Sequence, residues 1–311
     1  MKHRTKINIV LVCVLLFIML LPVQVLAAGD IDSTKPASLT IVYKDNDTYI
    51  NGASFELYQV AKSTENNDYV LTGKFAELPI DVDSISAENM QYLSLTLEAY
   101  ATLYDVPPVK SDITNSFGSI EFKNLETGLY LVTGQTHTQD GFVYTTEPFL
   151  VFLPVTDATG DSWVYDVTAR PKFSCTPQGE TTELKVIKVW KDDGNESSRP
   201  NDITVHLLKD GEIYDTITLN SDNNWRWSWT ELDGEHTWSV AEVVPDGYTV
   251  EITRNGSTYT CVNTKPHTPP PPPPDLPHTG QLWWPVPILV AVGFAMIIIG
   301  IIRRRGGRNE A

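Results

Sequence analysis

Residues 185–191 read Lys-Val-Ile-Lys-Val-Trp-Lys, an alternation with a period of two that predicts a β-strand. Successive side chains of a strand point to opposite faces of its sheet, so Val186, Lys188 and Trp190 share one face. The valine and the tryptophan favour burial of that face. The strand therefore places a lysine within a row of apolar side chains.

Two later segments show the same anomaly. Residues 238–244 place Glu242 on an otherwise apolar face, and residues 259–263 place Asn263 on a face shared with a tyrosine and a cysteine. A lone buried lysine or carboxylate costs several kcal/mol unless it is paired or neutralised. We therefore expect these two residues to meet Lys188 inside one domain.

Short alternating runs separated by Gly, Asn and Asp fill two segments, residues 29–175 and 181–265. This pattern is typical of β-sandwiches and predicts an all-β fold of tandem immunoglobulin-like sandwiches. Strands of the first segment are expected at residues 39–43, 55–57, 128–132, 149–153 and 163–165. One inserted α-helix is predicted between a Ser86 cap and Pro107, because Met90, Leu93, Leu97, Tyr100 and Tyr104 recur at helical spacing. We expect this helix to pack across an open end or face of the first sandwich.

The N-terminus has the features of a secretion signal. Lys2, Arg4 and Lys6 precede an apolar core at residues 7–21, which is too short to span a membrane comfortably. Small residues then offer a cleavage site for a signal peptidase. Residues 1–28 are therefore predicted to be a removable signal peptide.

The C-terminus has four parts in a fixed order. Residues 266–275 form a Pro-rich spacer, and residues 276–280 read Leu-Pro-His-Thr-Gly. Residues 282–302 are an apolar run long enough to cross a bilayer as a transmembrane helix. Residues 303–311 begin with three arginines, which predict a cytoplasmic tail.

This order resembles the LPxTG sorting signal of Gram-positive surface proteins, with an ordinary membrane anchor as the alternative. The motif comprises Leu276, Pro277, His278, Thr279 and Gly280. In that family a sortase cuts between the threonine and the glycine, and joins the threonine to an amine of the peptidoglycan cross-bridge or to a pilin lysine. The resemblance implies a secreted, wall-anchored protein that meets the membrane only before sorting.

Composition narrows the function classes further. The chain has 39 acidic and 23 basic residues, a formal net charge of −16, which argues against a nucleic-acid partner. Between the terminal signals there are two cysteines, Cys175 and Cys261, whose pairing stays open. No metalloprotease, nucleophile-elbow, P-loop or dinucleotide motif occurs. We expect neither an enzyme nor a cofactor nor a metal, and residues 192–196 are interpreted as an acidic turn rather than a calcium loop.

Residues 181–265 resemble the Cna B-type domain of Gram-positive surface proteins and pilins along their whole length. The matching stretches are residues 186–193, 199–200, 205–211, 238–248 and 261–264, of which 238–248 is similar to the pilin E-box. In the family, the lysine of the first strand bonds spontaneously to the asparagine of the last and releases ammonia. The resemblance implies an isopeptide bond between Lys188 and Asn263, assisted by Glu242, in a single turnover.

Residues 38–44 and 128–132 resemble the N-terminal domain of SpaA-like minor pilins. Residues 133–135 are Thr-Gly-Gln where an E-box would place its glutamate, so we expect no isopeptide bond in this domain. Lys172 falls where shaft pilins carry the lysine that accepts the next subunit, although Arg170 replaces the tyrosine of that motif. Lys172 is either a pilin-linkage residue or a solvated residue between the domains.

Two functions follow from these resemblances. The first is a minor pilin subunit assembled by sortase. The second is a monomeric wall-anchored adhesin that binds a host matrix protein, a glycan or another microbial surface ligand. Trp225, Trp227 and Trp229 are expected on one strand face, where they either bind sugars or belong to the core.

Overall fold

The computed structural model describes residues 29–265, apart from 65–66, 81, 83–84, 87–88, 193 and 195. The predicted signal peptide (1–28), spacer (266–275), sorting motif (276–280), transmembrane helix (282–302) and basic tail (303–311) lie outside the described residues. Within the described part of the chain, no helix is both long enough and apolar enough to cross a membrane.

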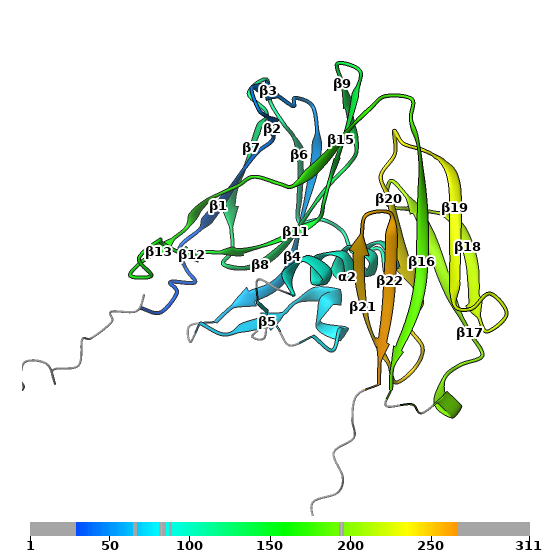
Figure 1. Ribbon diagram of the computed structural model, residues 1–311. Helices are drawn as coiled ribbons and strands as arrows, with labels where there is room; N and C mark the ends of the chain where they lie inside the picture. The colour runs from blue at the N-terminus through cyan, green and yellow to red at the C-terminus, as the bar shows by residue number, and fades with distance from the viewer. Residues whose placement is uncertain are drawn as a thin grey trace, which may run out of the picture. The chain divides into compact units, whose positions relative to one another are not determined.

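The first β-rich segment is a sandwich, as predicted (Figure 1). One sheet has the order β14 (Asp166–Ala169), β1 (Ala37–Val42) and β7 (Ser119–Leu125). The other has the order β11 (Phe149–Leu153), β8 (Gly128–Gly134), β4 (Ser54–Ser63) and β5 (Tyr69–Leu71), with β6 (Lys110–Ile113) also paired to β4. The alternating residues Leu39, Ile41 and Tyr43 are fully buried in the core, which confirms the predicted face of this segment.

Smaller elements surround this core. A three-stranded sheet has the order β15 (Phe173–Pro177), β10 (Phe142–Thr146) and β9 (His137–Gln139). Two short ribbons pair β2 (Lys44–Asp45) with β3 (Thr48–Tyr49) and β12 (Val155–Thr156) with β13 (Trp163–Val164). The 3₁₀ turn η1 (Gly73–Glu77) follows β5, whereas the 3₁₀ turn η3 (Glu196–Ser198) belongs to the second β-rich segment.

The predicted helix is present as α2 (Met90–Leu103). It begins after Asn89, three residues beyond the Ser86 cap that we expected. Ser86 and Asn89 nevertheless make the reciprocal hydrogen bonds of a capping box: the Asn89 amide donates to the Ser86 hydroxyl group at 3.4 Å, and the Ser86 amide donates to Oδ1 of Asn89 at 2.6 Å. The helix packs on β8 and β11 of the first sandwich, and also on β20 and β21 of the second. We predicted the face of α2 that packs on the first sandwich, but not the face that packs on the second.

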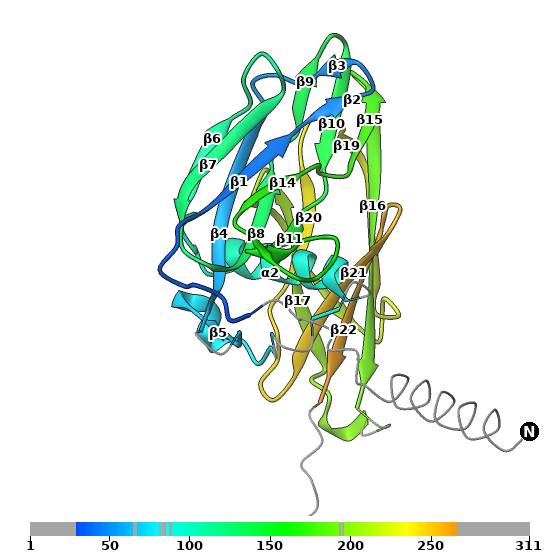
Figure 2. The same ribbon diagram turned by 90° about the vertical axis from the view of Figure 1, so that its left-hand side faces the viewer.

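The second β-rich segment is also a sandwich. One sheet has the order β19 (Arg226–Asp233), β16 (Thr181–Lys191), β22 (Thr258–Thr264) and β21 (Thr249–Asn255). The other has the order β18 (Glu212–Asn220), β17 (Asp202–Lys209) and β20 (Trp238–Glu242). Figure 2 shows β21 and β22 side by side, next to α2.

The first and last strands of this sandwich are parallel neighbours. In their register Lys188 lies opposite Cys261, and Trp190 lies opposite Asn263. Lys188 and Asn263 therefore occupy neighbouring positions on one face of the sheet. Because β20 belongs to the opposite sheet, a side chain of β20 can approach both residues across the core.

Candidate functional site

The structure brings Lys188, Glu242 and Asn263 together inside the second sandwich. Their exposed fractions are 5%, 2% and 0%. The Lys188 ammonium nitrogen lies 3.3 Å from Oε2 of Glu242, and Nδ2 of Asn263 donates a hydrogen bond of 2.5 Å to Oε1 of Glu242. The carboxyl group thus bridges an amine and a carboxamide that come from the first and last strands.

The surroundings of Lys188 limit its contact with water. Its ammonium nitrogen donates hydrogen bonds to the carbonyl oxygens of Cys261, at 3.2 Å, and Val189, at 3.4 Å. It also lies 4.6 Å from the ring centre of Trp190, which packs edge-on against Trp225 and Tyr248. These rings form an apolar wall beside the amine.

Burial favours the uncharged forms of both ionisable partners. It lowers the pKa of Lys188, against the opposing attraction of the Glu242 carboxylate. It raises the pKa of Glu242, although Lys188 and the hydrogen bond from Asn263 act in the other direction. A neutral amine is a nucleophile and a protonated carboxyl is a proton donor, so both pKa shifts move this pair toward the protonation states that attack on an amide requires.

The carboxamide of Asn263 has an unused acceptor, because its Oδ1 has no hydrogen-bond partner within the described structure. Half a turn of the amide group exchanges Oδ1 with Nδ2 and would place the oxygen 2.5 Å from Oε1 of Glu242. That distance suits a hydrogen bond donated by a protonated carboxyl group to a carbonyl oxygen. In this orientation Glu242 would polarise the carbonyl group of Asn263.

The two cysteines that could have paired are both free. Cys261 is buried beside the site, and Cys175 is exposed on β15 of the first sandwich. Burial raises the pKa of the Cys261 thiol, so it stays protonated and packs as a small apolar side chain. The bridge that the sequence left open is not formed.

The three tryptophans do not form the expected row. Trp225 precedes β19 with a φ of 57°, and Trp229 is buried and donates a hydrogen bond to Asp215. Trp227 alone of the three is strongly exposed, at 44%. Trp229 is part of the buried core cluster and Trp225, in the turn before β19, packs against it, so the core interpretation applies to these two and the three do not form an exposed row.

Among its described residues, the first sandwich lacks a comparable site. Its buried polar side chains in the described residues are serines and threonines (Ser38, Ser94, Thr96, Thr114, Thr127, Thr133 and Thr146). Lys172 is exposed just before β15, and its carbonyl oxygen accepts a hydrogen bond from the Glu147 amide. Across the described residues, no group of three or more His, Cys, Asp and Glu side chains is placed to hold a metal ion.

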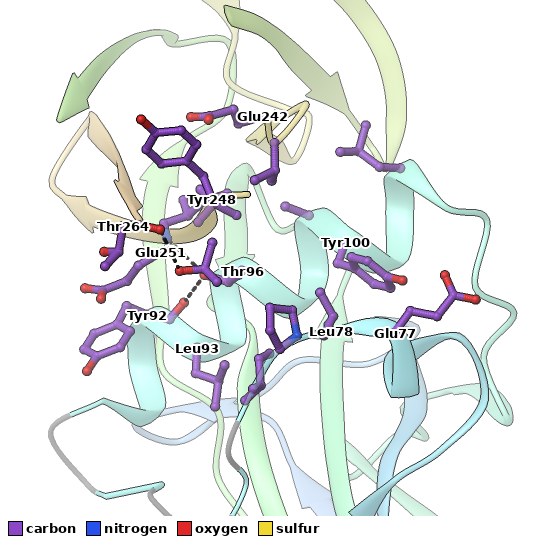
Figure 3. Close-up of a pocket in the computed structure, with 18 of the residues that line it drawn as sticks. Glu77, Leu78, Tyr92, Leu93, Thr96, Tyr100, Glu242, Tyr248, Glu251 and Thr264 are labelled. Atoms are coloured by element: carbon purple, nitrogen blue, oxygen red, sulfur yellow. Dashed lines mark hydrogen bonds between the residues drawn. The ribbon is translucent and has the colours of Figure 1, made fainter. Parts of the chain in front are cut away.

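A cavity of about 420 Å³ lies between α2 and the second sandwich, next to Glu242 (Figure 3). Residues of α2 such as Tyr92 and Thr96 line one side, and Tyr248 and Glu251 line the other. This contribution of α2 was not predicted from the sequence. The available signal was the second apolar face of the helix, outside the stripe used to predict it.

Two family models match this chain. Residues 30–172 match the Gram-positive pilin subunit D1, N-terminal domain, and residues 184–264 match the Cna protein B-type domain. The chain therefore combines a region similar to the Gram-positive pilin D1 domain with a region similar to the Cna B-type domain.

Similar proteins include the collagen adhesin of Staphylococcus aureus, which is 27% identical over 229 residues. That alignment covers 64% of this chain and 17% of the adhesin. Similar solved structures include the major pilin SpaD of Corynebacterium diphtheriae, at 18% identity and a TM-score of 0.31, covering 76% of this chain and 65% of that one. The basal pilin SpaE of Lactobacillus rhamnosus GG has 12% identity and a TM-score of 0.32, covering 72% and 85%.

Proposed function

We propose that this chain is a cell-wall-anchored surface protein that serves as a minor pilin subunit. In this proposal a sortase attaches it through Thr279, and an amide bond between Lys188 and Asn263 stiffens its second domain. The observation that carries the proposal is the buried contact of Glu242 with both the amine and the carboxamide. The two matched domain families support the surface role.

The proposed bond forms by direct attack of the amine. The neutral amine of Lys188 attacks the carboxamide carbon of Asn263 while Glu242 donates a proton to its oxygen. The tetrahedral intermediate then collapses, a C–N bond to the side-chain nitrogen of Asn263 breaks, and Glu242 transfers a proton from the attacking nitrogen to the departing one. One amide forms and one ammonia leaves, so the site reacts once and regenerates no free amine.

This bond would change how the domain carries a load. A pull on the chain enters the second sandwich through β16 and leaves it through β22. With Lys188 joined to Asn263, the force passes directly between these two strands. The residues between them are then shielded from extension, which suits a protein held at one end and pulled at the other.

The anchoring step is tested by replacing Thr279 with alanine. The expected result is a loss of nearly all material that stays bound to purified peptidoglycan after boiling in detergent, since the acyl bond to the wall is made through this threonine. His278→Ala is the matched control, because it changes the variable position of the same motif. Equal wall attachment of Thr279→Ala and wild type would contradict the proposal.

A monomeric adhesin is the second candidate, favoured by the similarity to the collagen adhesin. The exposed position of Lys172 favours the pilin instead, because a linkage lysine must be accessible. Denaturing gels separate the two functions: a pilin gives a ladder of sortase-linked species, and an adhesin gives a single wall-released species. Lys172→Ala identifies whether this lysine links the subunits of the ladder.

A further inference from the structure

We infer that helix α2 of the first domain seals the reactive site of the second domain, so that Leu95, Thr96 and Ala99 are positioning residues for amide formation. This inference rests on the proposed Lys188–Asn263 bond. It adds that the chemistry of one domain depends on the docking of the other.

The seal lies along one side of the second sandwich. Each of its two sheets ends in an edge strand there, β20 in one sheet and β21 in the other, and α2 packs against both. β20 carries Glu242, and β21 pairs with β22, which carries Asn263. The helix therefore lies over the gap between these two edge strands, beside the cavity next to Glu242, and the side chains of Lys188 and Glu242 have no exposed surface.

The helix contributes apolar side chains to the core of the second sandwich. Leu95 and Ala99 are 7% and 4% exposed, and both belong to the same buried cluster as Val240 and Ile252. Leu97, on the opposite face of α2, is fully buried in a cluster of the first domain. Leu95 thus belongs to the contact of α2 with the second domain, and Leu97 to its contact with the first.

A polar contact fixes the helix on the edge strand. Oγ1 of Thr96 accepts a hydrogen bond of 2.9 Å from the amide of Ile252 and donates one of 3.0 Å to the carbonyl oxygen of Tyr92 (Figure 3). The Ile252 amide is buried and faces away from β22, so it would lose its partner without this hydroxyl group. Ile252 lies opposite Cys261, two residues before Asn263.

Exclusion of water is the link between this contact and the chemistry. A low local dielectric raises the fraction of the neutral amine–carboxyl pair relative to the ion pair of the same two groups, whereas entry of water stabilises the ion pair. The neutral pair and the ion pair hold the same number of protons. Loosening the seal therefore lowers the reactive fraction, and also widens the pH range over which the pair holds one proton.

Other ionisable groups surround this seam and enter any pH profile. They are Glu98 on α2, Glu251 and Arg254 on β21, Tyr259 and Cys261 on β22, Asp192 and Arg199 beside Trp190, and Glu77, Tyr92, Tyr248 and Lys265 around the cavity. Burial raises the pKa of Glu98 to about 7, so Glu98→Gln is a necessary control.

The first test compares Leu95→Ala with Leu97→Ala in the full-length chain. Both remove the same atoms from a buried leucine of α2, but only Leu95 faces the second domain. The chain is made by cell-free synthesis, chased for increasing times and digested, and mass spectrometry quantifies the peptide pair joined through Lys188 and Asn263. Leu95→Ala is expected to react about tenfold more slowly, which corresponds to a change of one pKa unit in the balance between the neutral pair and the ion pair. Leu97→Ala is expected to keep the wild-type rate.

The second test uses Thr96→Val, with Thr96→Ser as the variant that restores the hydroxyl group. In a pH series of the chase, the valine variant is expected to give a lower and broader profile than wild type, and the serine variant is expected to restore it. A purely structural defect would lower the rate of amide formation at every pH, without moving the pH values at which the rate falls on either side of its maximum. Equal rates for the two leucine variants, or unchanged low-pH and high-pH limits of the rate profile for Thr96→Val, would overturn the inference. Absence of the joined peptides in wild type would overturn the bond itself.

Discussion

Lys188→Met is expected to lower the free energy of unfolding of the second sandwich by about 4 kcal/mol. The reason is that the proposed amide closes a loop of about 75 residues, and the chain-entropy argument for cross-links gives a stabilisation of this size. Methionine fills a similar volume without a charge. Tryptophan fluorescence during denaturant unfolding is a suitable measurement, because among the described tryptophans only Trp163 lies outside this sandwich.

A double variant separates the covalent contribution from the electrostatic one. Lys188→Met combined with Glu242→Leu also removes the buried carboxyl group, and apolar replacement of a buried ion pair is often neutral or stabilising. The double variant is therefore expected to remain less stable than wild type, because it still lacks the bond. Wild-type stability in the double variant would show that no covalent closure contributes.

Glu242→Gln is expected to slow amide formation by at least a hundredfold. Glutamine keeps the shape and the hydrogen-bonding capacity of the side chain, but it cannot transfer protons between the attacking and departing nitrogens. The measurement is the fraction of molecules that have lost ammonia as a function of time after folding. An unchanged rate would mean that Glu242 only fills space between Lys188 and Asn263.

The same reaction has a defined pH dependence in wild type. It slows at low pH, where Lys188 is protonated and has no free electron pair, and at high pH, where Glu242 is ionised and has no proton to donate. Because burial lowers the first pKa and raises the second, these two limits lie closer together than for the free side chains.

The pairing of polar residues was predictable because a period of two assigns side chains to faces. Lys188, Glu242 and Asn263 each interrupt an apolar face, and a buried charge without a partner is costly, so their meeting followed from local pattern and energy. The same reasoning identified the buried faces of β1 and β16. These inferences need no knowledge of long-range packing.

Other features depended on contacts that local periodicity does not contain. The prediction of three tryptophans on one strand face was wrong because Trp225 has a positive φ and lies in the turn before the strand, which the alternation could not indicate. The second buried face of α2, with Leu95 and Ala99, becomes meaningful only when the edge strands of another domain lie against it.

Intact mass spectrometry of the wild-type exported region, residues 29–275, tests the central claim most directly. The account predicts a mass lower than the sequence requires by one ammonia, with the full mass restored in Lys188→Ala. A wild-type mass equal to the sum of its residues would contradict the Lys188–Asn263 bond, and a deficit of two ammonias would show that the first domain also forms one.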